Sequence, residues 1–351
     1  MTRFLTAASL LALLAACGDG QPFFDQNGNL VDGGSGGETD GSGEGEGDGG
    51  DGDGVDGDVA LPPGTRNPSR SSGIVRFEAR NDIGGGYAQE FTYNARNDTF
   101  TVDNLAFDGE NTYQRGDRIG TLGGYAVYDA DVTTRDFLTG NQIGQIVPYR
   151  AILGLSENAE DDERRTTFAI VRTGGYIDYG FGGFVYERNG GAVLPDEGQA
   201  GFTGSYAGLR VYTNRGGLDY TQGDIEIAID FDDFNANDAV KGVIFNRQAF
   251  DEDGVRVTGL ALPTLTFDIV EGASVLEGTG EISGSLRSYI GTATGERELY
   301  EEGEYYAIIA GDTTDRQDGG EVVGVFVVES EDRRYEDVTA QETGGFIVYR
   351  D

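Results

Sequence analysis

The side chains that could do chemistry in this chain are almost all carboxylates, hydroxyls and guanidinium groups. The sequence has no histidine, which is the commonest general base and metal ligand, and Cys17 is its single cysteine. A catalytic site would therefore depend on paired carboxylates, such as Asp232-Asp233, Asp251-Glu252-Asp253 or Glu301-Glu302. Because the chain holds 62 acidic residues, adjacent carboxylates are expected to occur by composition alone in solvated loops. We predict no catalytic residue and no cofactor.

Two patterns near the N-terminus match parts of functional motifs but lack the neighbouring residues that these motifs require. Gly33-Gly34-Ser35-Gly36-Gly37 fits the Gly-x-Ser-x-Gly nucleophile elbow, but no strand is expected before it and no histidine can activate Ser35. Residues 51–58 alternate carboxylates with glycine, which suits a hard cation such as calcium. An EF-hand loop needs Gly at its sixth position and Glu at its twelfth, and this run does not supply both. We predict no metal site, with calcium capture by the acidic run as the alternative.

Cys17 stands at the end of an N-terminal targeting segment. A basic start at residues 1–3 precedes an apolar run at residues 4–16, and Leu14-Ala15-Ala16-Cys17 has the form of a bacterial lipobox. The run is about 13 residues long, against the roughly 18–20 that a membrane span requires. An ordinary signal peptide with a chance cysteine, or a short transmembrane anchor, is the alternative. We predict that residues 1–16 are a lipoprotein signal peptide and that Cys17 is lipidated.

The charge balance restricts the partners. Against 62 Asp and Glu the chain has 25 Lys and Arg, a net charge of −37. Nucleic-acid binding needs a basic surface that neutralises phosphates, and adsorption to anionic lipid is also unfavourable, so neither is expected. Membrane attachment then depends on acyl chains at Cys17, and two chains suffice for stable anchoring. Gly18 stands where Asp would favour inner-membrane retention, so we predict the outer membrane.

Composition separates a tether from a first folded part. Residues 19–58 hold twelve acidic residues and no Lys or Arg, and they are rich in glycine, so they cannot bury enough apolar surface to fold. We predict a disordered, acidic, Gly-rich tether over residues 17–65. Residues 66–197 alternate short β-branched and aromatic runs with glycine turns, which predicts a smaller β-rich domain. Its expected strands include residues 74–78, 99–102, 125–128, 168–171 and 184–186.

Residues 198–351 are more regular and predict an eight-stranded barrel. Ile225, Ile227 and Ile229 alternate with Glu226 and Asp230, which is the period of a strand with one buried face. Eight such strands in series predict an up-and-down antiparallel barrel filled by side chains. Carboxylates on its polar face would be costly against lipid, so we expect a soluble barrel rather than one that spans the membrane. The expected strands are residues 202–213, 224–231, 239–246, 264–270, 280–286, 304–310, 321–328 and 344–349.

The order of motifs in this last part resembles a known family. Five segments occur in order: Gly201-Phe202-Thr203-Gly204-Ser205-Tyr206-Ala207-Gly208, Ile229-Asp230-Phe231-Asp232, Val240-Lys241-Gly242-Val243-Ile244, Gly278-Thr279-Gly280-Glu281-Ile282-Ser283-Gly284-Ser285 and Gly320-Glu321-Val322-Val323-Gly324-Val325-Phe326. The family pattern has a Gly-x-Tyr-x-Gly strand, an acidic-Phe-acidic strand end, a strand with a central Gly and a late Glu-Val-x-Gly-x-Phe strand. Over residues 198–351 the chain is therefore similar to the barrel domain of transferrin-binding protein B and related surface lipoproteins.

The resemblance implies both an architecture and a role. Residues 66–197 would take the place of the family's handle domain, giving one handle-plus-barrel lobe where the full receptor has two. It implies a non-enzymatic, lipid-anchored protein at the cell surface that binds a host or environmental protein or a small ligand, with an outer-membrane barrel as a further partner. Transferrin itself is not carried over. The alternatives are a structural envelope lipoprotein facing the periplasm and a carboxylate-based hydrolase.

Tyrosines indicate where a ligand would bind. Tyr289, Tyr300, Tyr305 and Tyr306 lie around residues 289–304, which we expect to form a long connection rich in Gly, Thr and Glu. Long loops on a rigid scaffold commonly carry binding, and tyrosine is a frequent interface anchor. Ordinary turn and core tyrosines are the alternative. A ligand would carry complementary positive charge, and no individual ligand-binding residue is assigned.

The lipid anchor generates the first prediction. Cys17→Ala removes the only thiol that can take a diacylglyceryl group, so the protein should appear in soluble or uncleaved form. Fractionation of cells into membrane and soluble parts, with the mass of the N-terminal peptide, measures this. A variant that is cleaved and still sediments with the membrane would contradict the anchor.

Overall fold

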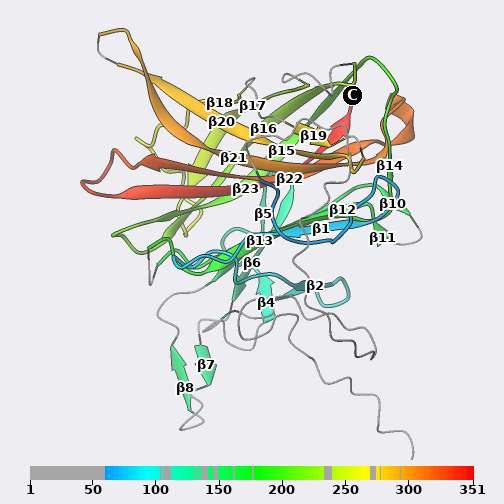
Figure 1. Ribbon diagram of the computed structural model, residues 1–351. Helices are drawn as coiled ribbons and strands as arrows, with labels where there is room; N and C mark the ends of the chain where they lie inside the picture. Colours follow the sequence, from blue (N-terminus) through cyan, green and yellow to red (C-terminus); the bar gives the residue numbers. More distant parts are fainter. Residues whose placement is uncertain are drawn as a thin grey trace, which may run out of the picture. The chain divides into compact units, whose positions relative to one another are not determined.

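The computed structural model is an all-β structure built from two sheets, as expected from the sequence (Figure 1). Among the described residues, no helix has the length and apolar character that a membrane crossing requires. Cys17, Ser35 and the acidic run at residues 51–58 lie outside the described residues. The structure describes residues 60–102, 105, 112–130, 133–135, 141–144, 149–160, 163–175, 178–232, 239–268, 274–276, 278–292 and 294–351.

The first sheet is antiparallel and has the strand order β1-β13-β12-β9-β6-β4-β3-β2, with β5 beside β6. Every strand expected between residues 74 and 186 is present. Two short ladders, β7 with β8 and β10 with β11, lie outside it. The bounds are β1 (Ile74–Phe77), β2 (Phe91–Asn94), β3 (Thr99–Val102), β4 (Thr112–Arg115), β5 (Thr121–Leu122), β6 (Tyr125–Ala130), β7 (Thr133–Arg135), β8 (Gln142–Gly144), β9 (Arg150–Leu155), β10 (Ala159–Glu160), β11 (Glu163–Arg164), β12 (Thr166–Arg172) and β13 (Gly182–Arg188).

The second sheet closes into an eight-stranded antiparallel barrel. Its ring runs β15-β16-β17-β18-β20-β21-β22-β23, and β23 returns to pair with β15. β14 adds to β21 in parallel, and β19 pairs with β20. The bounds are β14 (Ala192–Val193), β15 (Gln199–Tyr212), β16 (Leu218–Asp230), β17 (Val240–Phe250), β18 (Leu265–Phe267), β19 (Ser274–Leu276), β20 (Glu281–Gly291), β21 (Arg297–Asp312), β22 (Glu321–Glu331) and β23 (Thr339–Arg350), with a 3-10 turn at Arg316–Asp318.

One prediction about the barrel is wrong. Residues 289–304 are not a long connection, because β20 and β21 continue as a paired hairpin from Glu281 opposite Ile308 to Gly291 opposite Arg297. The strands extend this far because residues 297–300 include Leu and Tyr, which suit an extended backbone. Only five residues, 292–296, form the turn, where Gly295 has a positive φ of 85°.

The alternation predicted for β16 is confirmed and shows how the barrel is filled. Ile225, Ile227 and Ile229 are at most 3% exposed and point into the barrel, whereas Glu226 faces out. Aromatic rings from neighbouring strands fill the remaining space. A Cβ added at Gly344 of β23 would lie 2.3 Å from the ring of Phe326, so the glycine makes room for that ring.

A buried ionic quartet occupies the other part of the interior. Arg210 of β15, Arg247 of β17, Glu301 of β21 and Glu342 of β23 have side chains with no solvent exposure. Arg247 contacts Glu301 at 2.7 Å and Glu342 at 2.9 Å, while Arg210 lies 3.5–3.6 Å from both carboxylates. Hydroxyls complete the network, since Ser288 donates to Glu301 at 2.6 Å. The barrel interior is therefore not purely apolar.

Two β-bulges lie next to members of this quartet. On β17 the register with β16 shifts by one residue around Asn246, whose φ is +52°, so that Arg247 turns inward instead of outward. On β21 the register with β20 shifts at Tyr300, and Glu301 is the first residue after it. Glu301 faces inward in the same alternation as Gly303 and Tyr305.

The first sheet packs against the outside of the barrel. Phe168 of β12 is fully buried, and a Cβ added at Gly345 of β23 would come within 2.3 Å of its ring. Polar contacts join the same surfaces: Arg76 of β1 forms a two-point ion pair with Glu281 of β20 at 2.6 and 3.0 Å. Glu321 of β22 is also buried, and burial raises the pKa of its carboxyl, although hydrogen bonds from neighbouring side chains oppose this.

The close contact at Gly345 is testable. Gly345→Ala should lower the free energy of unfolding by about 1–3 kcal/mol, because Phe168 is enclosed and cannot move aside freely. Gly216→Ala is the matched control, since nothing lies within 4 Å of a Cβ at that position. Thermal or denaturant unfolding measures both. Equal stability of the two variants would show that the sheets are not in close contact at this point.

The buried quartet predicts that substitutions at the adjacent residues Glu301 and Glu302 change the free energy of unfolding by very different amounts. Glu301→Gln leaves buried arginine charge uncompensated and should cost about 3–5 kcal/mol of unfolding free energy. Glu302→Gln, one residue along and facing out, should change it by less than about 0.5 kcal/mol. Denaturant unfolding at neutral pH compares them, and similar stabilities would contradict the buried quartet.

The ion pair of Glu301 with Arg247 also predicts that the stability difference between the Glu301→Gln and Glu302→Gln variants depends on pH. Burial acts to raise the pKa of Glu301, but the charge and hydrogen bonds of Arg247 outweigh it, and the pKa is lowered from the ordinary value of 4.5. A lowered carboxyl pKa contributes stability above the unfolded value and loses it as the pH falls through the folded value. The stability difference between the two Gln variants should therefore narrow below pH 4.5. A difference that stays constant on acidification would contradict this.

Candidate functional site

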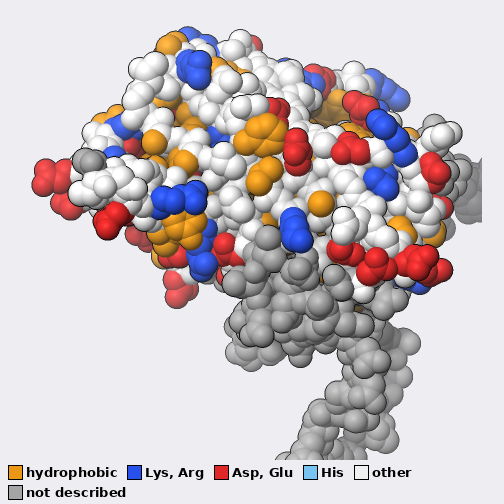
Figure 2. Space-filling view, turned by 90° about the horizontal axis from the view of Figure 1, so that it is seen from above, with side chains coloured by type: hydrophobic (Ala, Val, Ile, Leu, Met, Phe, Trp, Pro, Cys, Tyr) orange, Lys and Arg blue, Asp and Glu red, His pale blue; other side chains and the backbone are white. Residues whose placement is uncertain are grey.

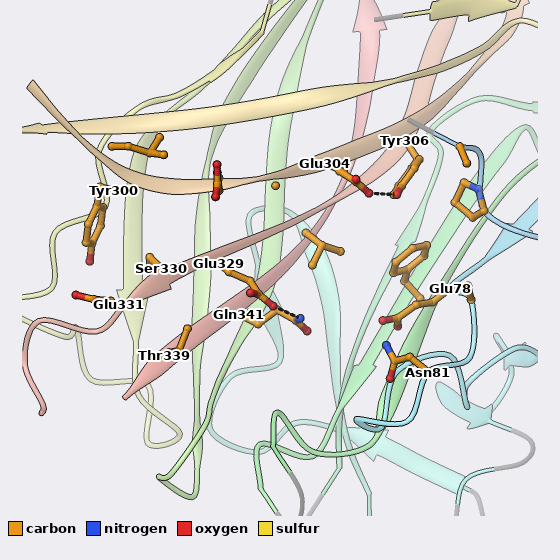
Figure 3. Close-up of a pocket in the computed structure, with 18 of the residues that line it drawn as sticks. Glu78, Asn81, Tyr300, Glu304, Tyr306, Glu329, Ser330, Glu331, Thr339 and Gln341 are labelled. Atoms are coloured by element: carbon orange, nitrogen blue, oxygen red, sulfur yellow. Dashed lines mark hydrogen bonds between the residues drawn. The ribbon is translucent and has the colours of Figure 1, made fainter. Parts of the chain in front are cut away.

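A groove of about 870 Å³ lies on the outer side of β21, β22 and β23 (Figure 3). Its floor is made by outward-facing side chains of these three strands. Its wall is made by residues 60–63 and 78–81 and by Phe184 of β13. We call this hollow the acidic groove, because most of its charged lining residues are glutamates.

Strand alternation determines which side chains reach the groove. Along β21, Glu301, Gly303 and Tyr305 turn into the barrel, so Glu302, Glu304 and Tyr306 turn outward. The same period puts Val327, Glu329 and Glu331 of β22 and Thr339 and Gln341 of β23 on the groove floor.

The groove carries a strong excess of negative charge. Six glutamates line it against one arginine, Arg333. Two of the glutamates have salt bridges: Glu78 to Arg172 at 2.8 Å and Glu298 to Arg333 at 3.2 Å. Elsewhere on the barrel, on the face seen in Figure 2, basic and acidic side chains are interspersed. The remaining four groove glutamates are Glu302, Glu304, Glu329 and Glu331.

These four glutamates have few partners. Glu302 approaches Arg287 only at 3.9 Å, and Glu329 accepts a hydrogen bond from Gln341 at 3.0 Å. Glu302 and Glu329 also stand directly opposite each other on β21 and β22. Like charges in directly opposed positions of an antiparallel pair are destabilising.

Aromatic groups give the groove apolar contact area. The ring of Tyr306 stacks on Phe184, with 6.4 Å between centroids, and its hydroxyl donates to Glu304 (Figure 3). Burial, together with that hydrogen bond, raises the pKa of Tyr306, so its hydroxyl stays neutral at physiological pH. At the other end Arg333 lies 5.5 Å from the ring of Tyr300.

The tyrosines singled out in the sequence separate into different environments. Tyr300 and Tyr306 line the acidic groove. Tyr289 is 41% exposed on the β20–β21 hairpin, opposite Leu299. Tyr305 is a core residue inside the barrel, with its ring 4.0 Å from that of Phe267.

The paired carboxylates considered for catalysis do not converge. Glu301 points into the barrel and Glu302 out of it, and Asp253 forms an exposed salt bridge with Arg118 at 2.9 Å. Asp232 is exposed, and its neighbour lies outside the described residues. Over the described ranges, no group of three or more acidic, His or Cys side chains is placed to hold a metal ion.

Sequence reasoning did not identify the groove. Its floor brings together residues from three strands, and its wall comes from segments more than 100 positions earlier in the chain. A signal was nonetheless present, because Glu302-Gly303-Glu304 and Glu329-Ser330-Glu331 each place two glutamates on one face once the expected strands at residues 304–310 and 321–328 are extended to include them.

Comparisons with known proteins assign no family to this chain. No protein-family model matches this sequence, and no curated protein matches it by sequence. Among solved structures it is similar to a single-substitution mutant of the vaccine antigen transferrin-binding protein B from Haemophilus parasuis Hp5, with 11% identity and a TM-score of 0.33. That match covers 72% of this chain and 41% of the other.

A double mutant of the same antigen matches with 11% identity and a TM-score of 0.31, over 74% of this chain and 44% of that one. The chain thus spans less than half the length of these structures. At such TM-scores the likeness carries no conclusion about a ligand.

Proposed function

We propose that this chain is a non-enzymatic binding protein, lipid-anchored through Cys17 to the outer membrane, and that the acidic groove receives a positively charged segment of a partner protein. The observation that carries the proposal is the opposed pair Glu302 and Glu329. Their repulsion costs free energy in the unbound fold and would be relieved by a cation from a ligand.

The size and lining of the groove support a protein ligand. A hollow of about 870 Å³ with tyrosine at both ends offers stacking surfaces for long basic side chains. Ala60, which follows the predicted acidic tether in the sequence, lines the wall of the groove. Twelve acidic residues at positions 19–58 would then increase the local attraction for a basic partner.

The second candidate is a structural envelope lipoprotein that faces the periplasm. Protease treatment of intact cells separates the two, because only a surface-exposed chain is cleaved. No feature of the described residues favours this candidate over the binding protein.

Neutralising the groove tests the proposal. A variant that combines Glu304→Gln, Glu329→Gln and Glu331→Gln should bind a partner captured from extracellular fluid at least about tenfold more weakly, since three charges that face the ligand are lost. The full chain on intact cells serves as bait, and affinity is measured at low and moderate salt.

The control variant combines Glu163→Gln, Asp196→Asn and Glu197→Gln, which removes the same charge from exposed positions outside the groove. It should bind as the unchanged protein does. Equal binding by both triple variants would contradict the groove as the binding site, and a chain inaccessible to protease on intact cells would contradict the surface role.

A further inference from the structure

The acidic groove ends in an unpaired stretch of strand. β21 pairs with β22 from Glu302 opposite Glu329 to Ala310 opposite Glu321, and no further. Residues 297–301 of β21 pair only with β20. On the other side of the opening, Ser330 and Glu331 of β22 pair only with β23. Two strands of the barrel thus separate here, and each leaves one edge open.

The bulge at Tyr300 stands where the separation begins. It adds one residue to β21 relative to β20, and bulges bend the strand that carries them. The tip of the β20–β21 hairpin lies apart from the tip of the β22–β23 hairpin (Figure 1). The opening continues the groove, since Glu298, Leu299, Tyr300, Ser330, Glu331 and Arg333 all line it.

An open edge of this kind is a template for another strand. About half of the backbone N–H and C=O groups along an edge point outward without a partner, and proteins usually protect such edges with charged side chains, proline, a bulge or a covering element. Arg297, Glu298 and the bulge at Tyr300 protect residues 297–301 in part, and the segment contains neither Lys nor Pro. Leu299, in the middle of the segment, is 43% exposed. Within the described residues, no segment pairs with this edge.

We infer that the partner segment binds by strand addition: an extended, basic stretch of a partner protein pairs with β21 along residues 297–301 and directs its basic side chains to the groove glutamates. The inference rests on the proposed function and specifies its binding mode. Main-chain hydrogen bonds would supply affinity, and alternate side chains would supply specificity. The charge of the lining selects the occupant, because Glu302 and Glu331 flank the open edge, whereas Glu298 is paired with Arg333.

The test uses a defined probe. A fluorescent peptide of about eight residues, alternating Lys or Arg with Val, is compared with the same peptide N-methylated at alternate backbone positions. The methyl groups remove strand hydrogen bonds and keep the charge. Fluorescence anisotropy with the full chain in detergent should show binding that weakens at least about tenfold on methylation. Amide hydrogen exchange should slow at residues 297–301 when the unmethylated peptide is bound.

A pair of variants locates the site. Leu299→Lys puts a charged edge-blocking side chain on the open strand and should weaken peptide binding about tenfold. Val255→Lys adds the same charge at a position that is 62% exposed and outside the groove, and it should leave binding within about twofold. Both side chains are exposed, so both variants should fold, which circular dichroism checks.

The outcomes separate this inference from the function on which it rests. Equal binding of the two peptides, with unchanged exchange at residues 297–301, would overturn strand addition while leaving the acidic groove as an electrostatic site. No binding of either peptide at low salt would overturn strand addition, and capture of a protein partner that needs the groove glutamates would still support the proposed function.

Discussion

The ionic quartet inside the barrel is the constraint on which the rest of this structure depends. Removing two arginines and two glutamates from water is costly, and only mutual pairing with additional hydroxyl partners offsets that cost. Arg247 reaches the interior because a bulge at Asn246 precedes it, and Glu301 is the first inward residue after the bulge at Tyr300. The bulge on β21 also stands where that strand parts from β22. The bulge at Tyr300 thus adjoins both the buried charge of Glu301 and the open end of the groove.

Much of the fold could be predicted from local pattern, and the groove could not. The alternation in β16 and the glycine punctuation report on nearest neighbours along the chain, so they indicate strands and turns directly. The quartet joins residues that are up to 132 positions apart, as with Arg210 and Glu342. Sequence periodicity does not predict which of these charged side chains will be in contact. The bulges at Asn246 and Tyr300 interrupt the period itself. The stretch after Tyr289 was expected to be a loop because it is rich in Gly, Thr and Glu, although most of it forms strands.

The two sets of glutamates illustrate opposite uses of the same side chain. Glu301 and Glu342 are inside and matched by arginine, and they fix the positions of four strands relative to one another. Glu302 and Glu329 are outside and opposed to each other, so they destabilise the pairing of β21 with β22 where that pairing ends. Glu301 thus stabilises the closed barrel from inside. Its neighbour Glu302 leaves an uncompensated negative charge on the outer face.

The glycine pair in β23 has a consequence for how the two sheets respond to each other. At Gly344 the ring of Phe326 lies against the backbone from inside the barrel, and at Gly345 the ring of Phe168 lies against it from outside. Only the thickness of a peptide backbone separates the barrel core from the packing of the first sheet. A displacement of either ring would therefore be transmitted through the wall almost undamped, so the two sheets behave mechanically as one body at this point.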